Sequence, residues 1–229
     1  MSCCPTEVLP VKTTYDRQGD NVYITGEGNT KGLLFVPDIF GPHPNAYHVA
    51  DILAGKGFLV VVPDFFRGKE WPLEDFPPKD GFAADPFQNF IKALTYDNLK
   101  PRVEQGLKLL KALGATSIGA VGFCWGGKIA ISALGEGLVK AAASPHPSFF
   151  TVEDAKAVKG PFALLPSKDD GELADVKAAL NPDFKHVYHY FDDMHHGFCA
   201  ARADFTNELN RTRANECINI MADFFNANL

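Results

Sequence analysis

The sequence predicts an α/β fold in which a mostly parallel sheet lies between two layers of helices. Short apolar segments alternate with segments of helical periodicity along most of the 229 residues, which indicates right-handed βαβ crossovers. Residues 58–62 are apolar throughout and stop at Pro63, as expected for a strand buried on both faces. Polar or reactive residues follow several expected strands, and such sheets bind ligands at the carboxyl ends of their strands.

The first half of the chain begins with two expected strands and a helix. Residues 21–26 alternate like a half-exposed strand, and residues 32–37 form an apolar run that ends at a proline. Residues 45–55 carry apolar side chains at helical spacing and end at a glycine. Residues 99–113 show the same spacing and are followed by Gly114. We expect a helix over each of these two segments.

From residue 117 onward, strands and helices alternate in the same way, and each strand ends in a polar or proline-containing loop. We expect strands at residues 117–122, 139–144, 162–166 and 186–191, and helices at residues 128–134, 172–180 and 205–225. Together the elements predict a single domain over residues 1–229, with residues 1–19 as a loose N-terminal arm or an arm tied to the surface.

Residues 65–98 interrupt this alternation with an irregular segment rich in aromatic residues and prolines. Long excursions of this kind inside a compact domain are usually functional, and aromatic side chains suit the wall or lid of a pocket. The alternative is a surface excursion whose aromatic residues anchor it to the core.

Composition and charge narrow the class of partner. The chain is 46% hydrophobic and 22% charged, with a net charge of −6 and no block of like charges. This argues against nucleic acid or an anionic membrane as the main partner and leaves a small molecule. We expect a monomer or a weak homo-oligomer.

The five cysteines are odd in number and lack Cys-x-x-Cys spacing, so neither a disulfide framework nor a zinc site is indicated. No metal or organic cofactor is expected. The sequence opens without a secretory pattern and contains no apolar run of membrane-spanning length. We therefore expect a cytoplasmic protein, in a reducing compartment that would keep a reactive thiol usable.

The segment Gly122-Phe123-Cys124-Trp125-Gly126 places a cysteine between a strand end and a helix start. The pattern Gly-x-Cys-x-Gly is that of the nucleophile elbow of an α/β-hydrolase, with sulfur in the place of the usual serine. Small residues two positions either side let strand and helix pass closely, and the following backbone N–H can face a developing oxyanion. The alternative is a cysteine buried between glycines in an ordinary βα unit.

The loops after later strands carry the other groups that a nucleophilic cysteine needs. Asp169 and Asp170 follow one strand and His196 follows the next, which gives the order nucleophile, acid, histidine of α/β-hydrolases. A neighbouring imidazole can deprotonate the thiol and later protonate the leaving group, while a carboxylate fixes the tautomer of that imidazole. Physical reasoning does not separate Asp169 from Asp170, and His195 is expected to be structural.

On these motifs the chain resembles the dienelactone hydrolase (carboxymethylenebutenolidase) family over nearly its whole length. The matching pieces are Asp38-Ile39-Phe40-Gly41, Pro63-Asp64-Phe65-Phe66-Arg67-Gly68, Gly122-Phe123-Cys124-Trp125-Gly126-Gly127, Ser167-Lys168-Asp169 and His196-Gly197-Phe198.

The resemblance implies a catalytic triad of Cys124, Asp169 and His196 and an oxyanion hole made by the backbone N–H groups of Ile39 and Trp125. It also implies that an acidic residue partners the resting thiol, here Asp38. The alternative is that Asp38, one methylene shorter than the glutamate of bacterial members, falls short of the sulfur and hydrogen-bonds the loop backbone instead.

The resemblance further implies that arginines recognise a substrate carboxylate. The candidates here are Arg67 and Arg202, and Arg202 lies farther from the histidine than the family pattern has it. Phe40 and His146 are further candidates for contact with the substrate, and the alternative for His146 is a structural turn histidine.

The predicted activity is cysteine-dependent hydrolysis of small esters or lactones through a thioester acyl-enzyme. Two alternatives remain open at this point. One is a promiscuous esterase or thioesterase with another natural substrate. The other is a non-catalytic binding or redox-sensing protein that uses a reactive Cys124.

Overall fold

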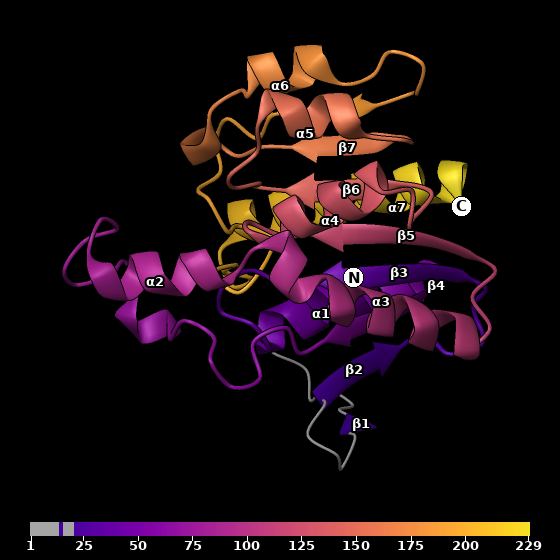
Figure 1. The fold of residues 1–229 in the computed structure, drawn as a ribbon, viewed down its shortest axis with the longest axis horizontal. Coiled ribbons are helices and arrows are strands. Elements are labelled where there is room, and N and C mark those ends of the chain that lie inside the picture. The colour runs from indigo at the N-terminus through magenta and orange to yellow at the C-terminus, as the bar shows by residue number, and fades with distance from the viewer. Residues whose placement is uncertain (1–13, 16–20) are drawn as a thin grey trace.

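Eight strands form one sheet with the order β1-β2-β4-β3-β5-β6-β7-β8 in the computed structural model, which describes residues 14–15 and 21–229 (Figure 1). The strands β1 and β2 pair antiparallel with each other, and β2 pairs antiparallel with β4, whereas all other neighbours are parallel. The strands are β1 (Thr14–Tyr15), β2 (Asn21–Thr25), β3 (Lys31–Val36), β4 (Phe58–Pro63), β5 (Ser117–Gly122), β6 (Ala142–Pro145), β7 (Phe162–Leu165) and β8 (Val187–Tyr188). The predicted α/β class with a mostly parallel sheet is confirmed.

Helices cover both faces of the sheet. The helices are α1 (Pro44–Gly55), α2 (Asp85–Ala93), α3 (Tyr96–Ala112), α4 (Gly126–Gly135), α5 (Val152–Ala157), α6 (Ala174–Ala179) and α7 (Glu208–Asn228). The side chains of α1 and α7 pack in one hydrophobic cluster, and those of α3, α4, α5 and α6 pack in another. The chain therefore has three layers, with the sheet between two sets of helices (Figure 1).

The central strands are apolar because both of their faces are covered. Along β4, Leu59 and Val61 join one hydrophobic cluster, while Phe58, Val60 and Val62 join the other. Every residue of β4 is buried, as the uninterrupted apolar run of residues 58–62 predicts.

The irregular excursion expected at residues 65–98 is more ordered than predicted. It contains a short 3₁₀ helix (Leu73–Asp75) and α2, and its last residues already belong to α3. The sequence of α2 carries ordinary helix-start features, namely Asp85 and Pro86 in the first turn. The prolines before α2 obscured this helix in the sequence.

The helix α5 was also not predicted. Thr151 and Asp154 form a capping box, in which each side chain accepts a hydrogen bond from the other residue's backbone N–H. Such reciprocal capping stabilises a helix of only six residues.

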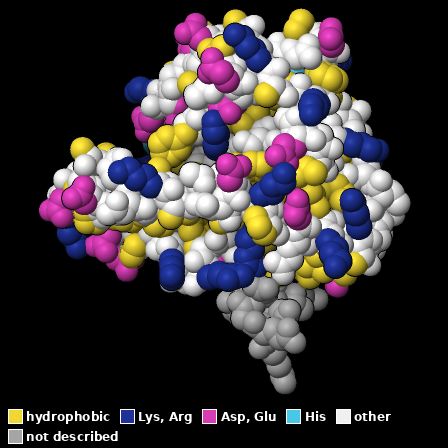
Figure 2. All heavy atoms as spheres, viewed as in Figure 1, with side chains coloured by type: hydrophobic (Ala, Val, Ile, Leu, Met, Phe, Trp, Pro, Cys, Tyr) yellow, Lys and Arg dark blue, Asp and Glu magenta, His cyan; other side chains and the backbone are white. Residues whose placement is uncertain are grey.

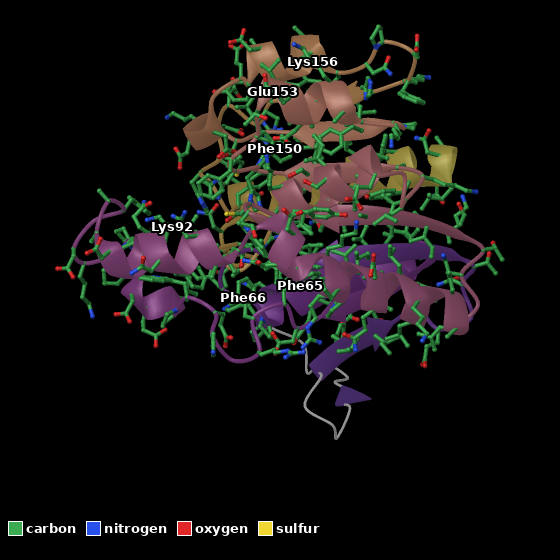
Figure 3. The ribbon with its side chains drawn as sticks, in the orientation of Figure 1. Phe65, Phe66, Lys92, Phe150, Glu153 and Lys156 are labelled. Carbon is green, nitrogen blue, oxygen red and sulfur yellow. The ribbon has the colours of Figure 1, made fainter. Side chains whose placement is uncertain are left out.

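The excursion stands out from one side of the sheet, where Figure 1 shows α2 projecting beyond the ends of the strands. It is held to the rest of the molecule by aromatic contacts. Phe66 stacks on Phe90 of α2 at 6.1 Å between ring centroids and lies 5.3 Å from the ring of Trp125. Figure 3 shows Phe65 and Phe66 between the sheet and this projecting lobe. Figure 2 shows the outline of the molecule hollowed between the lobe and the part above it.

Most of the expected N-terminal arm, including Cys3 and Cys4, lies outside the described residues. Within the described part of the chain, no helix combines the length and apolarity needed to cross a membrane. On the face drawn in Figure 2, basic and acidic side chains are interspersed rather than gathered by sign.

Candidate active site

Cys124 lies at the turn between β5 and α4, in a backbone conformation that side chains rarely adopt, with φ of 55°. The glycines around it are required by close packing. A Cβ on Gly122 would lie 2.0 Å from the carbonyl oxygen of Gly126, and one on Gly126 would lie 2.5 Å from that of Pro37. The sequence pattern around Cys124 therefore forms a tight strand–turn–helix that lifts the cysteine side chain out of the sheet.

The segment after β6 supports this turn. The backbone N–H of Cys124 donates to the carbonyl of Pro145 at 3.3 Å, and that of Ser148 donates to the carbonyl of Cys124 at 3.0 Å. The hydroxyl of Ser148 lies 3.5 Å from Cys124 Sγ. Cys124 itself is 9% exposed, so its sulfur is sheltered but reachable.

His196 follows β8 and is fixed by its ring and its backbone. Its Nδ1 lies 2.5 Å from Asp170 Oδ1, and its carbonyl accepts a hydrogen bond from Arg202 at 2.7 Å. Burial opposes the charged imidazole, but the neighbouring Cys124 sulfur and the hydrogen bond with Asp170 outweigh it. Together they raise the pKa of His196 to about 10. The sulfur and the carboxylate thus both favour the protonated form of this imidazole.

Asp170, rather than Asp169, contacts the imidazole, which corrects the triad that the family resemblance implied. Both the N–H and the hydroxyl of Ser167 donate to Asp170 Oδ2, at 2.7 and 2.6 Å. This cap turns the other oxygen toward His196 and leaves the Asp170 side chain only 6% exposed. Asp169 is exposed and accepts a hydrogen bond from the backbone N–H of His196 at 2.9 Å.

The two residues predicted to form an oxyanion hole, Ile39 and Trp125, lie close to the cysteine. Trp125 follows Cys124 directly at the start of α4, and Ile39 lines the same cavity as Cys124. Among the hydrogen bonds of the described residues, neither backbone N–H donates to another protein group. Two amide donors therefore remain available to a ligand oxygen.

Asp38 braces the loop rather than the sulfur. Its two carboxylate oxygens accept hydrogen bonds from the backbone N–H groups of Phe40, at 3.1 Å, and Ala201, at 3.0 Å. It is 1% exposed, and burial raises its pKa to about 6, although these two hydrogen bonds act in the opposite direction. The sequence led us to expect Asp38 to partner the thiol. Both of its oxygens instead accept hydrogen bonds from backbone N–H groups, as a side chain one methylene shorter than glutamate allows.

The cavity at Cys124 has a volume of about 640 Å³. Its walls come from the excursion and from the loops that follow β3, β5, β6, β7 and β8. The lining residues are Ile39, Phe76, Phe82, Phe87, Gln88, Ile91, Cys124, Ser148, Phe149, Asp169, His196 and Arg202. Five of these twelve come from residues 65–98, so the excursion forms a wall of the cavity.

The remaining candidates are placed at different distances from this cavity. Phe40 is buried and lines a small recess together with Cys124, His196 and Arg202. Arg67 is exposed, and it belongs to the lining of neither the cavity nor the recess. The structure therefore brings Arg202 to the site and does not bring Arg67 to it.

His146 is fully buried and does not line the cavity. Its ring packs edge-on against that of His196, with 5.1 Å between centroids. Burial and the charge of His196 hold the pKa of His146 well below its usual range, so it remains a neutral imidazole behind His196. This position fits a structural histidine better than one that contacts the substrate.

The sequence analysis missed Ser148 and left Asp170 unresolved. Ser148 belongs to no recognisable sequence motif. It contacts Cys124 because the loop after β6 folds back toward the cysteine. Asp170 did have a signal, since Ser167 and Asp170 have the spacing of a capping box. Among the described side chains, no group of three His, Cys, Asp or Glu residues is placed to hold a metal ion.

Comparison with known proteins shows the family to which the chain belongs. Residues 21–229 match the model of the dienelactone hydrolase family. An AIM2 family protein of Schizosaccharomyces pombe is 32% identical over 243 residues, which cover 98% of each chain. The hydrolase pyvD of Aspergillus violaceofuscus is 32% identical over 201 residues, which cover 83% of this chain and 77% of the relative.

Among solved structures, a dienelactone hydrolase of Klebsiella pneumoniae superposes with a TM-score of 0.72. The superposition covers 90% of this chain and 92% of the other at 16% identity, and it shows that the two share the α/β-hydrolase fold. The chain described here belongs to the dienelactone hydrolase family and is a carboxylic ester or lactone hydrolase.

Proposed function

We propose that this protein hydrolyses small esters or lactones through a thioester on Cys124, with His196 as the proton carrier and Asp170 as the group that orients it. The observation that carries the proposal is the placement of Cys124 and His196 in one cavity while the far ring nitrogen of His196 bonds with Asp170. A thiolate, an imidazole and a carboxylate in this relation are what nucleophilic acyl transfer requires.

In the first step, the Cys124 thiolate attacks the carbonyl carbon of the ester and forms a C–S bond. Negative charge then develops on the carbonyl oxygen, where the N–H groups of Ile39 and Trp125 can donate to it. The C–O bond breaks as His196 gives its proton to the leaving alkoxide. In a lactone the alcohol remains part of the acyl group, because the broken bond belongs to a ring.

In the second step, neutral His196 takes a proton from a water molecule, whose oxygen attacks the thioester carbonyl. The C–S bond breaks, and the carboxylic acid leaves as the thiolate is restored beside the protonated imidazole. Asp170 keeps the imidazole in one orientation throughout, since its own second oxygen is held by Ser167.

Among the described residues that line the cavity, Arg202 is the one lysine or arginine that could recognise a carboxylate on the substrate. Its guanidinium already donates to the carbonyl of His196 and lies 5.1 Å from the centre of the Phe76 ring. Arg202 would therefore bind a carboxylate with its remaining N–H groups. A reducing compartment such as the cytoplasm would keep Cys124 in the thiol or thiolate form.

The proposal is tested by alkylation and substitution of Cys124. Iodoacetamide, with modification followed on the Cys124 peptide by mass spectrometry, should abolish hydrolysis of p-nitrophenyl acetate in step with modification. Cys124→Ala should be inactive, and Cys124→Ser should be far weaker than the native enzyme because a hydroxyl is much harder to ionise than a thiol.

The matched control is Cys3→Ser combined with Cys4→Ser, which should keep full activity and full sensitivity to iodoacetamide. Turnover that survives in Cys124→Ala would exclude the mechanism. Reversible oxidation of Cys124 by peroxide in a protein without ester turnover would instead favour a redox-sensing role.

A further inference from the structure

The cavity at Cys124 has a wall built largely from aromatic side chains. Phe76, Phe82 and Phe87 contact one another edge to face, at 5.7 Å between Phe76 and Phe82 and 5.3 Å between Phe82 and Phe87. Ile91 of α2 and Phe149 complete this wall. Flat apolar groups pack well against such a set of rings.

Two of these rings are, together with Leu209, the most exposed large apolar side chains in the described part of the chain. Phe82 is 50% exposed and Phe149 is 56% exposed, and they approach the cavity from different segments of the chain. Large apolar side chains at the mouth of a cavity leave an unburied surface that a bound ligand can cover. The wall is therefore incomplete without an apolar ligand.

The charges of the lining balance. Asp169 contributes one negative charge and Arg202 one positive charge, while a thiolate and an imidazolium at Cys124 and His196 would cancel each other. A site selective for an anion normally concentrates positive charge around it. The lining favours a neutral acyl group over a carboxylate.

We propose that the preferred substrate is an ester or lactone with a flat, uncharged apolar acyl part, such as an aryl group, bound between Phe82 and Phe149. The proposal rests on the proposed hydrolase function and specifies its substrate class. The carbonyl would lie at Cys124 and the apolar group against the wall formed by the excursion and α2.

The experiment compares p-nitrophenyl esters that share one leaving group and differ in the acyl part: acetate, phenylacetate and hemisuccinate. The native enzyme should show kcat/KM for phenylacetate about 10-fold or more above that for acetate, in line with burial of one ring. The hemisuccinate, which carries a carboxylate, should be no better than acetate.

Phe82→Ala and Phe149→Ala should each lower kcat/KM for phenylacetate several-fold more than kcat/KM for acetate, and so remove most of the preference for phenylacetate. The matched control is Leu209→Ala, an exposed apolar residue of α7 at 49% exposure, which should change neither. Equal kcat/KM for all three esters, or a preference for hemisuccinate, would overturn the substrate class. Failure of the hydrolase proposal would appear differently, as turnover of every ester in Cys124→Ala.

The hydroxyl of Ser148 makes a separate contact, 3.5 Å from the sulfur of Cys124. Ser148 is held in place by its own backbone N–H, which donates to the carbonyl of Cys124 at 3.0 Å. It lies in a segment where His146 and Phe149 both have positive φ, at 35° and 63°. Such strained backbone persists where the surrounding structure fixes it, commonly at functional sites.

The family resemblance led us to expect an acidic partner for the thiol, but Asp38 uses both of its oxygens on backbone N–H groups. The hydroxyl of Ser148 lies within hydrogen-bond distance of the sulfur, which His196 also contacts. A serine hydroxyl can donate to a thiolate, whereas a carboxylate would repel it.

We infer that Ser148 is a further catalytic residue, whose hydroxyl donates a hydrogen bond to the Cys124 thiolate before attack and to the same sulfur when it leaves the thioester.

The test is the pH dependence of Cys124 alkylation by iodoacetamide, followed on the Cys124 peptide by mass spectrometry. In Ser148→Ala the pH midpoint of alkylation should rise by about one unit or more, as expected for the loss of a hydrogen bond to a charged group. Ser148→Thr, which keeps the hydroxyl, should restore the native midpoint. A structural role alone would lower activity without moving the midpoint, and that result would overturn the assignment.

Discussion

At the scale of single residues, His196 is held by contacts to its ring, its backbone N–H and its carbonyl. Asp170 bonds its ring, Asp169 accepts from its backbone N–H, and Arg202 donates to its carbonyl. The ring of His146 packs behind it. These contacts fix the position of the imidazole relative to Cys124. A fixed position is required for His196 to exchange protons with the leaving group and with water.

The two neighbouring aspartates make a matched pair for testing this assignment. Asp170→Asn should lower kcat by on the order of 10²–10⁴, because the imidazole loses the acceptor that orients it. Asp169→Asn should lower kcat much less, because an amide oxygen can still accept from the backbone N–H of His196. Steady-state kinetics with p-nitrophenyl acetate would measure both. A larger loss in Asp169→Asn would return the triad role to Asp169.

Arg202 should act chiefly through His196. Arg202→Leu should lower kcat about 10-fold for neutral and carboxylated esters alike, because the carbonyl of His196 loses a charge-assisted hydrogen bond. Arg202→Lys keeps a charged donor and should recover part of the activity. If Arg202→Leu instead raised KM only for the carboxylated ester, the arginine would be a substrate-binding residue.

At the scale of elements, the turn between β5 and α4 depends on atoms too close to admit a side chain. The Cβ-free faces of Gly122 and Gly126 let the start of α4 pass over the ends of β5 and β3. The result is that the strand, the turn at Cys124 and the start of α4 lie in close contact, with Trp125 directly before the helix.

Gly122→Ala should destabilise the protein by about 1–3 kcal/mol or more, because the new Cβ would overlap the carbonyl of Gly126. Gly55→Ala is the control, because nothing lies within 4 Å of a Cβ there and the residue ends α1. That change should be neutral or stabilise the protein by up to about 1 kcal/mol. Urea unfolding would measure both, and similar stabilities of the two variants would show that the turn can widen.

At the scale of the whole molecule, Asp38 connects segments that are far apart in the sequence. One oxygen bonds Phe40, in the loop that follows β3, and the other bonds Ala201, which lies 163 residues away from Asp38. The carboxylate thereby joins the loop carrying the Ile39 amide to the segment that follows His196. An asparagine can offer only one oxygen to these two N–H groups.

Asp38→Asn should therefore lower stability and kcat while Cys124 alkylation at pH 7 stays unchanged. Burial raises the pKa of Asp38 from 3.8 to about 6, so the folded state holds its proton more tightly than the unfolded state. The stability that this proton contributes is fully present below pH 4 and is lost as pH rises through 6, on the order of 3 kcal/mol.

The stability gap between native protein and Asp38→Asn should accordingly be wider at pH 4 than at pH 7, as measured by urea unfolding at both values. Faster alkylation of Cys124 in this variant would show that Asp38 restrains the thiol after all. A gap that does not change with pH would mean that Asp38 is ionised at both values.

The sequence by itself determined the fold class, the order of most elements and the positions of the cysteine and the histidine. These features depend on local chemistry. Apolar runs require burial, and the close turn at Cys124 requires glycine at positions 122 and 126. Parallel strands bring their carboxyl ends to one edge of the sheet. The helix α2 could have been predicted from Asp85 and Pro86, but the surrounding prolines pointed to a loop.

Only the tertiary structure decided which aspartate meets the imidazole, which arginine reaches the cavity, and which side chain bonds the sulfur. Asp169 and Asp170 are adjacent in sequence, and the cap from Ser167 makes them different by rotating one carboxylate inward. Arg202 and Ser148 reach the site through loops that return from separate strands. Contacts between distant segments depend on how the chain packs as a whole, so the local sequence around Arg202 and Ser148 does not reveal them.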